Sequence, residues 1–197
     1  SRFDAVVILL LGVSAVFGRT DQVRQPKGFV LANNHLGFNL LNQLSEENER
    51  NPTRENIFFS PYSIAVAMAM VHQGAGGSTA KELESALGYA LAKLDKGDKA
   101  LMAKEVDESN QNIFADEVAS NNSLHTLKSG NAMMVNQNFP LLDSFKETLV
   151  SKFRAESFQL DFGKDPTAAM NLINAWAANK TNGKIKSLLS EPPSPDT

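Results

Sequence analysis

One run of residues constrains the fold of this chain more than any other feature. Residues 64–71, Ile-Ala-Val-Ala-Met-Ala-Met-Val, are apolar on every side of a helix, so we expect that helix to be buried on every side. Eight residues are too few to cross the roughly 30 Å hydrocarbon core of a membrane. The burial therefore has to come from other elements of the same protein.

The residues that flank this run predict where its helix begins and ends. Ile57–Phe59 is expected to form a short apolar strand, and the Ser60 hydroxyl can cap the helix that follows. Pro61 takes the first helical position, where its missing N–H costs nothing. Gly74 ends the helix, and Thr79–Glu82 has the Thr-x-x-Glu spacing of a capping box, which predicts a second helix.

Periodicity predicts the remaining elements. Leu36, Leu40 and Leu44 form an i, i+4 stripe of a first amphipathic helix. Turns or polar connections are expected at residues 48–54 and 110–123, further helices at 79–87, 91–106, 145–153 and from Pro166 through Trp176, and strands at 132–135 and 158–162. Because helices and strands mix without strict alternation, the fold class is α+β.

The segment 56–88 resembles the serpin family, the serine protease inhibitor superfamily. Serpin residues stand at Asn56, Ser60, Pro61, Ser63, Ala67, Met70, Gly74, Ala75, Gly77, Thr79 and Leu87. A second block, Ile173–Trp176 followed by Thr181–Ile185, resembles the end of the serpin helix that lies across the main sheet. Between the two blocks, Leu127–Met134, Phe139, Phe145, Phe153 and Asp161–Phe162 follow the family's order and spacing. The resemblance extends over residues 28–190.

This resemblance implies a serpin-like α+β fold of mixed helices and sheets that is incomplete. Serpins are considerably longer, and their reactive loop lies near the C-terminus. We therefore expect residues 19–197 to be the N-terminal part of a single serpin domain. On this interpretation the chain is a fragment that stops before the later strands of the central sheet and before the reactive loop.

The first 18 residues have the pattern of a secretory signal peptide. Arg2 precedes an apolar run, Ala5–Phe17, and Gly18 is a small residue at a suitable cleavage point. Asp4 fits this pattern poorly, and a buried N-terminal helix is the alternative. Two acceptor tripeptides for N-glycosylation, at Asn121 and Asn179, agree with an exported protein.

Composition narrows the classes of function. The net charge of −3, with the two signs interleaved, gives no reason to expect nucleic acid or an anionic membrane as a partner. The chain has no cysteine, which excludes disulfides, thiolate zinc sites and cysteine catalysis within it. The histidines His35, His72 and His125 have no ligand spacing, so we expect no metal, and no cofactor motif is present.

Two motifs invite a chemical interpretation that we do not favour. Gly74–Thr79 is glycine-rich, but it lacks the P-loop lysine and follows a helix, so a helix-to-helix turn is expected instead of a phosphate cradle. Lys93, Lys96, Lys99 and Lys104 could suggest glycosaminoglycan binding. Acidic residues interrupt this series and the lysines do not share one helical face, which favours an ordinary solvated surface.

Ser60 and Ser63 are the two candidate functional serines. A serine hydrolase would need a general base and an oxyanion hole, and no Gly-x-Ser-x-Gly elbow is present, so we expect no catalytic residue. One alternative is a purely structural N-cap. The resemblance implies a third role: Ser60, Pro61 and Ser63 match the serpin shutter, the region under the strands that separate when the reactive loop inserts.

The resemblance implies a function for the complete protein. The expected parent is a secreted, extracellular, monomeric inhibitor, not an enzyme, whose partner is an extracellular serine protease. It would act by cleavage of the reactive loop and insertion of that loop into the central sheet. The alternative is a serpin that does not inhibit, such as a carrier, chaperone or storage protein. A third possibility is that the 197 residues are themselves the product.

Overall fold

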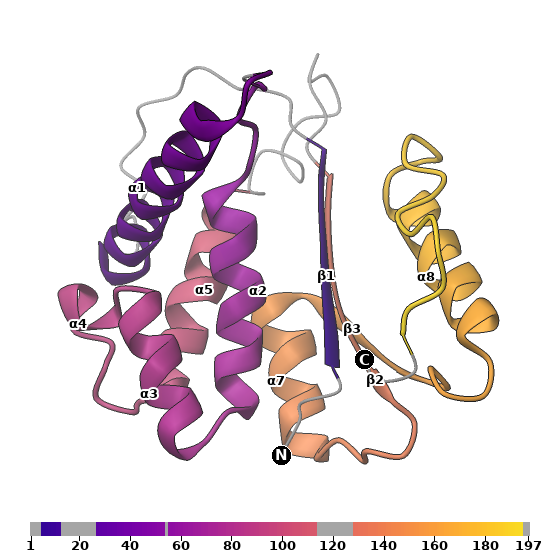
Figure 1. The fold of residues 1–197 in the computed structure, drawn as a ribbon. Coiled ribbons are helices and arrows are strands. Elements are labelled where there is room, and N and C mark those ends of the chain that lie inside the picture. Colours follow the sequence, from indigo (N-terminus) through magenta and orange to yellow (C-terminus); the bar gives the residue numbers. More distant parts are fainter. Residues whose placement is uncertain (1–4, 13–26, 54, 114–127, 195–197) are drawn as a thin grey trace, which may run out of the picture. The chain divides into compact units, whose positions relative to one another are not determined.

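The computed structural model describes residues 5–12, 27–53, 55–113 and 128–194 (Figure 1). Its contacts divide the chain into two compact units. One unit, residues 22–113, is helical within its described part, and the other combines residues 1–21 with 114–197 and holds the described strands. Both helices and strands are present without strict alternation, as the α+β prediction requires.

The helical unit is arranged around one central helix, α2. Its elements are α1 (Lys27–Arg50), α2 (Pro61–Gly74), α3 (Gly77–Ala86), α4 (Tyr89–Ala92) and α5 (Lys99–Ile113). Helices α1, α3 and α5 all contact α2. The helix predicted from the apolar run therefore packs against three other helices of the same unit.

Burial of α2 is less complete than its sequence predicts. Ala65, Val66, Ala69 and Met70 are buried, whereas Ile64, Ala67, Met68 and Val71 are only half-buried. The expectation of burial on every side was therefore wrong for the chain as it stands. Three contacting helices cover only part of the circumference of a fourth, and the large side chains on the remaining side keep some access to solvent.

Several local predictions in this unit were wrong in detail. Residues 57–59 form no strand, and Phe58 is 87% exposed. A strand forms only where a neighbouring strand supplies backbone hydrogen bonds, which an apolar run alone does not guarantee. Helix α3 begins at Gly77, with Gly76 as an N-cap that makes no side-chain bond, so Thr79 does not act as the cap. The helix expected at 91–106 is broken by residues 93–98, where Lys93 and Gly97 have positive φ.

The second unit contains a three-stranded sheet in the order β1-β2-β3. Strand β1 (Ala5–Gly12) runs antiparallel to β2 (Lys128–Asn136), with Ala5 opposite Val135 and Gly12 opposite Lys128. Strand β3 (Ala155–Leu160) runs parallel to β2, with Asn131 opposite Ala155. Helix α7 (Asp143–Phe153) leads directly into β3 and contacts it. The strand predicted at 132–135 and the helix over 145–153 are confirmed, and the strand predicted at 158–162 is confirmed as far as Leu160.

Helix α8 (Pro166–Lys180) packs on one face of this sheet (Figure 1). Asp165 caps it by accepting a hydrogen bond from the Ala168 N–H at 2.9 Å, and Pro166 is its first residue, as predicted. Alternate residues of β2, Ala132 and Met134, share an apolar cluster with the inner side of α8, and the full cluster is Ala132, Met134, Leu160, Phe162, Ala169, Ile173, Trp176 and Ala177. We call this contact the α8 seat.

The expected signal peptide coincides in part with strand β1. In the chain as it stands, the backbone of residues 5–12 adds a strand to the sheet, and this run of Val, Ile and Leu suits a strand. The leader at residues 1–18 and the single domain at 19–197 remain predictions. No helix within the described ranges is both long and apolar enough to span a bilayer.

Candidate functional site

The predicted shutter residues lie together at the start of α2. Ser60 has an extended backbone, with φ −113° and ψ 106°, and Pro61 occupies the first helical position. The Ser60 Oγ accepts a hydrogen bond from the Ser63 N–H at 3.3 Å. This is the N-cap geometry that the sequence predicts, and it uses one of the free N–H groups of the first helical turn.

The two serine hydroxyls bond to each other. Ser63 Oγ donates to Ser60 Oγ at 2.8 Å, and the Ser63 side chain is buried. The hydroxyl proton of Ser63 is therefore used to hold the cap, whereas a nucleophile would present it to a general base. The arrangement can fix the entry of the chain into α2.

Helices α1 and α5 hold this site in place. The Tyr62 hydroxyl donates to Asn110 Oδ1 at 2.6 Å, and the Tyr62 ring packs edge-on against Phe29 with 6.0 Å between ring centroids. A Cβ added at Gly37 would lie 2.9 Å from Pro61 Cγ, so only glycine lets α1 approach the first turn of α2 this closely. Helices α1 and α5 thus both contact the first turn of α2, at Pro61 and Tyr62.

A buried polar cluster lies at the opposite end of α2 and was not predicted. His72 Nε2 lies 3.0 Å from Glu84 Oε1 of α3, and the His72 ring packs edge-on against Tyr89 at 5.4 Å. His72 Nδ1 and the Tyr89 hydroxyl are buried without a hydrogen-bond partner among the described residues. Burial, and then the nearby Glu84 carboxylate, raise the pKa of Tyr89. Nothing in the sequence pairs His72 with Glu84, which is twelve residues away on another helix.

The lysine series is divided among different local environments. The Lys99 ammonium donates to the carbonyls of Gln73 and Ala75 at the C-terminal end of α2, where a cation is favourable. Lys104 lies 3.8 Å from Glu108 one turn along α5. Lys93 ends α4 in a left-handed conformation. This distribution supports the expectation that the series is not a glycosaminoglycan site.

The remaining candidates are the glycine-rich turn, a metal site and the two glycosylation acceptors. Gly74–Gly77 is the turn between α2 and α3, as expected, and Gly77 has φ +58°. Within the described parts of the chain, no three His, Cys, Asp or Glu side chains come together as a metal site would require. Asn179 is exposed in the last turn of α8, whereas Asn121 and His125 lie outside the described residues.

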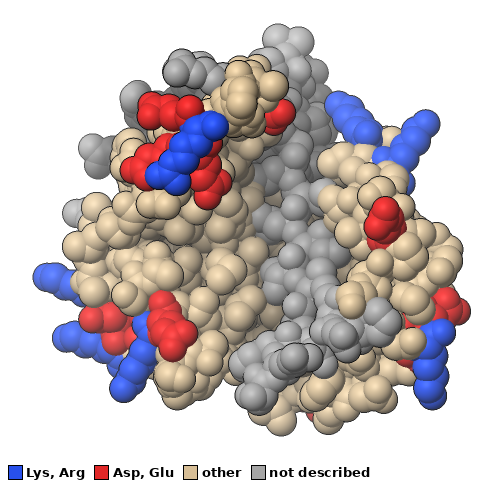
Figure 2. All heavy atoms as spheres, viewed as in Figure 1, with Lys and Arg blue, Asp and Glu red and all other residues tan. Residues whose placement is uncertain are grey.

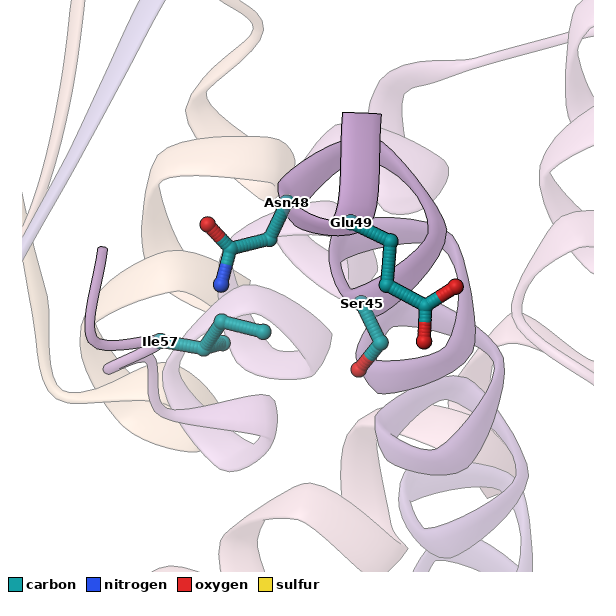
Figure 3. A pocket seen from close by; sticks show the side chains of 4 residues that line it. All are labelled: Ser45, Asn48, Glu49 and Ile57. Atoms are coloured by element: carbon teal, nitrogen blue, oxygen red, sulfur yellow. The ribbon is translucent and has the colours of Figure 1, made fainter. Parts of the chain in front are cut away.

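A small open pocket lies at the end of α1. It has a volume of about 190 Å³ and is lined by Ser45, Asn48, Glu49 and Ile57. Figure 3 shows the Glu49 carboxylate pointing away from Ile57. The Asn48 side chain is already engaged, donating to the Glu55 carbonyl at 2.7 Å and accepting from the Glu55 N–H at 2.8 Å. The pocket therefore lies between α1 and the segment before α2, which the Asn48 side chain connects, and its lining residues do not form a catalytic site.

Positively and negatively charged side chains are mixed on the face shown in Figure 2. Among the residues coloured in Figure 2, lysine and arginine side chains stand beside aspartate and glutamate. This mixture matches the net charge of −3 and the interleaved signs of the sequence. An extended basic surface of the kind that nucleic acid requires is not seen on this face.

Comparison with known proteins adds a family and a length. A family model described as Serpin (serine protease inhibitor) matches residues 31–197. Iripin-8 from Ixodes ricinus is 36% identical over 174 residues, which cover 88% of this chain and 40% of that protein. The chain thus spans about 40% of the length of the curated relatives that it matches.

Solved structures share the fold. Mouse protein-Z dependent protease inhibitor gives a TM-score of 0.70 at 23% identity, over 87% of this chain and 42% of that one. Lamprey angiotensinogen with its reaction loop cleaved gives a TM-score of 0.65 at 27% identity, over 86% of this chain and 45% of that one. Both similarities confirm the predicted fold class.

Proposed function

Because the chain belongs to the serpin family, we propose that it is the N-terminal part of a secreted serine-protease inhibitor. The observation that carries this proposal is the family match over residues 31–197, in which the start of α2 and the α8 seat both fall. The names of similar proteins support it, since one solved relative is itself a protease inhibitor. The active partner would be an extracellular serine protease.

The proposed mechanism follows from the resemblance. The protease attacks the reactive loop as a substrate: its serine oxygen bonds to the scissile carbonyl carbon, the peptide bond breaks, and an acyl-enzyme forms. The cleaved loop then inserts into the central sheet as an added strand and carries the protease with it. The uncleaved form is therefore kinetically trapped above a more stable form.

In this proposal the described residues belong to the moving parts. Ser60, Pro61 and Ser63 form the shutter, where the hydroxyl pair sets how α2 begins. Helix α8 lies on the sheet and has to yield when a strand is added. None of these residues selects the protease. That selection belongs to the reactive loop.

The shutter assignment can be tested by adding bulk where Ser63 is buried. In a complete serpin domain that carries this segment, we expect Ser63→Phe to disturb sheet opening and to increase polymers or the latent, loop-inserted form. Ser85→Phe is the matched control, because Ser85 is an exposed serine on the neighbouring helix α3. Native gels and protease titration measure both outcomes. Unchanged polymerisation and inhibition in Ser63→Phe would contradict the shutter assignment.

A serpin that does not inhibit is the second candidate. The resemblance itself leaves this choice to the hinge of the reactive loop. Small hinge residues permit insertion, whereas bulky residues or proline oppose it. Sequencing the transcript past Thr197 tests this directly: a small-residue hinge supports inhibition, and a bulky or proline-rich hinge supports the alternative.

The 197-residue chain acting alone is the third candidate. Its sheet would then depend on β1, which covers the edge of β2 over eight residues. Removal of a leader at 1–18 would leave that edge unpaired, and unpaired edges promote aggregation. We expect residues 19–197 alone to aggregate. A soluble monomer with a cooperative unfolding transition would contradict this expectation.

Secretion and glycosylation belong to the same proposal. The leader at 1–18 would direct export, and Asn179 is exposed at the end of α8, where a glycan could project into solvent. Treatment of the secreted protein with an N-glycosidase tests Asn121 and Asn179. We propose a monomer when the domain is complete, with no cofactor, no nucleic acid or membrane partner, and no glycosaminoglycan requirement.

A further inference from the structure

The edge of the α8 seat contains a polar contact that the apolar cluster does not explain. Glu156 of β3 accepts a hydrogen bond from Trp176 Nε1 at 3.3 Å and forms an ion pair with the Lys180 ammonium. Both contacts use the same oxygen, Oε1. One carboxylate of the sheet therefore binds two residues of α8 that are one turn apart.

Gly130 makes this contact possible. A Cβ added at Gly130 would lie 2.9 Å and 3.1 Å from Lys180 Cγ and Cβ, and 3.3 Å from Trp176 Cη2. The aliphatic part of Lys180 and the Trp176 ring thus lie directly against the backbone of β2. Gly130 lies two residues before Ala132 on β2, so both residues face the same side of the sheet. Ala132 pairs with Glu156 and belongs to the apolar cluster with α8, so this is the side that meets α8.

The contact is placed to hold the helix end without holding the fold. The Lys180 and Glu156 side chains are 35% and 44% exposed, and exposed ion pairs are individually weak. Earlier in α8 than Lys180, the side chains of Ile173 and Ala177 are fully buried in the apolar cluster. Losing the ion pair should therefore leave α8 helical and seated at its centre, while its last turn separates more easily from β2 and β3.

We propose that Glu156, Trp176 and Lys180 form a latch in which Glu156 is a positioning residue that sets how readily the last turn of α8 lifts from the sheet. We call these three residues the α8 latch. The proposal rests on the proposed inhibitor function, in which α8 has to yield during insertion of the cleaved loop. A looser latch then speeds insertion relative to release of the cleaved loop by the protease.

Trp176 provides the first test, because it is the only tryptophan of the chain. Acrylamide quenching of its fluorescence is measured in the full chain for Glu156→Gln, Lys180→Met and the double variant. Met keeps an unbranched stem over Gly130 but removes the charge. We expect each single variant to raise the quenching constant about twofold to fivefold, and the double variant to equal the larger single effect.

Lys184→Met is the matched control, since Lys184 is an exposed lysine just beyond α8. It should leave quenching unchanged, and Lys180→Arg should restore the original value. Unchanged quenching in both single variants, or effects that simply add in the double variant, would overturn the latch. So would an unmodified chain whose Trp176 is quenched as fully as in denaturant.

The second test separates the latch from the inhibitor function. In a complete serpin domain carrying this segment, Glu156→Gln should speed conversion to the latent form about twofold to fivefold and lower the number of inhibitor molecules consumed per protease. A merely structural role would lower the melting temperature without moving that ratio. If quenching responds but the unmodified domain inhibits no protease, the proposed function fails and the latch stands.

Discussion

The two compact units of the chain bury polar groups in opposite ways. Around α2, the His72 ring and the Tyr89 hydroxyl are fully enclosed, and each keeps one polar atom without a partner among the described residues. At the α8 seat the centre is apolar, and the charged residues Glu156 and Lys180 stay at the edge with access to water. The α2 region therefore has unpaired polar atoms in its interior, whereas the α8 seat keeps its charged side chains at the solvent-accessible edge.

This difference predicts how strongly a substitution in each region should change the free energy of unfolding. Water can replace a lost partner at the edge of the α8 seat, so the energetic effect there is small. Around His72 and Tyr89 the side chains are shielded from bulk solvent, so a lost partner leaves a desolvated group. The apolar centre of the α8 seat responds to lost volume instead.

The largest effect is expected at the apolar centre of the α8 seat. Ile173→Ala should lower the free energy of unfolding by about 2–5 kcal/mol, because it removes three carbons from a fully buried site. Leu172→Ala is the matched control on the same helix, where the side chain is 39% exposed and the loss should be much smaller. Urea denaturation followed by Trp176 fluorescence measures both. Equal losses would show that α8 is not seated as described.

A smaller effect is expected when the buried cluster loses its carboxylate. Glu84→Ala removes the partner of His72 Nε2, and the unpaired imidazole should cost about 1–3 kcal/mol. Glu82→Ala, at an exposed position of the same helix, should change stability little. If urea denaturation gives the same value for both variants, the His72 environment is not as enclosed as the comparison assumes.

The smallest effect at neutral pH is expected for Tyr89→Phe. Its hydroxyl is buried without a partner in the described chain, so removal should be neutral or stabilising by about 1 kcal/mol. The effect should grow in alkali. Because burial raises the pKa of Tyr89, the unfolded chain releases the phenolic proton near pH 10 while the folded chain retains it.

The sign of this pH effect is fixed by proton binding. Above about pH 10 the unfolded state binds fewer protons than the folded state, so Tyr89 makes stability fall as pH rises toward its raised pKa. Tyr89→Phe should remove this share of the alkaline loss. Urea midpoints of the two proteins between pH 8 and about 11 should diverge, and parallel curves would contradict the enclosed hydroxyl.

Local signals predicted much of the fold. Ser60 with Pro61, and Asp165 with Pro166, each placed a helix start correctly, because an N-cap depends on only three or four neighbouring residues. The alternating apolar residues of β3 also predicted a strand. Thr79 failed as a cap because α3 already begins at Gly77, two residues earlier.

The failure at residues 57–59 has a cause at longer range. These residues are suitable for a strand, yet a strand forms only when another strand supplies hydrogen bonds. Residues 5–12 have such a partner in β2, while the leader at 1–18, of which they are part, stays a prediction. Propensity alone does not determine which segments meet.

The family resemblance, the α+β class, the start of α2 at Ser60 and Pro61, and the helix that carries Trp176 could all be predicted from the sequence. These features follow from residues that are neighbours along the chain. The contact of Glu84 with His72 across twelve residues, and the meeting of Glu156, Trp176 and Lys180 over Gly130, became visible with the packed fold. Such contacts depend on how separate elements pack, since packing joins side chains whose spacing in the sequence carries no periodic signal.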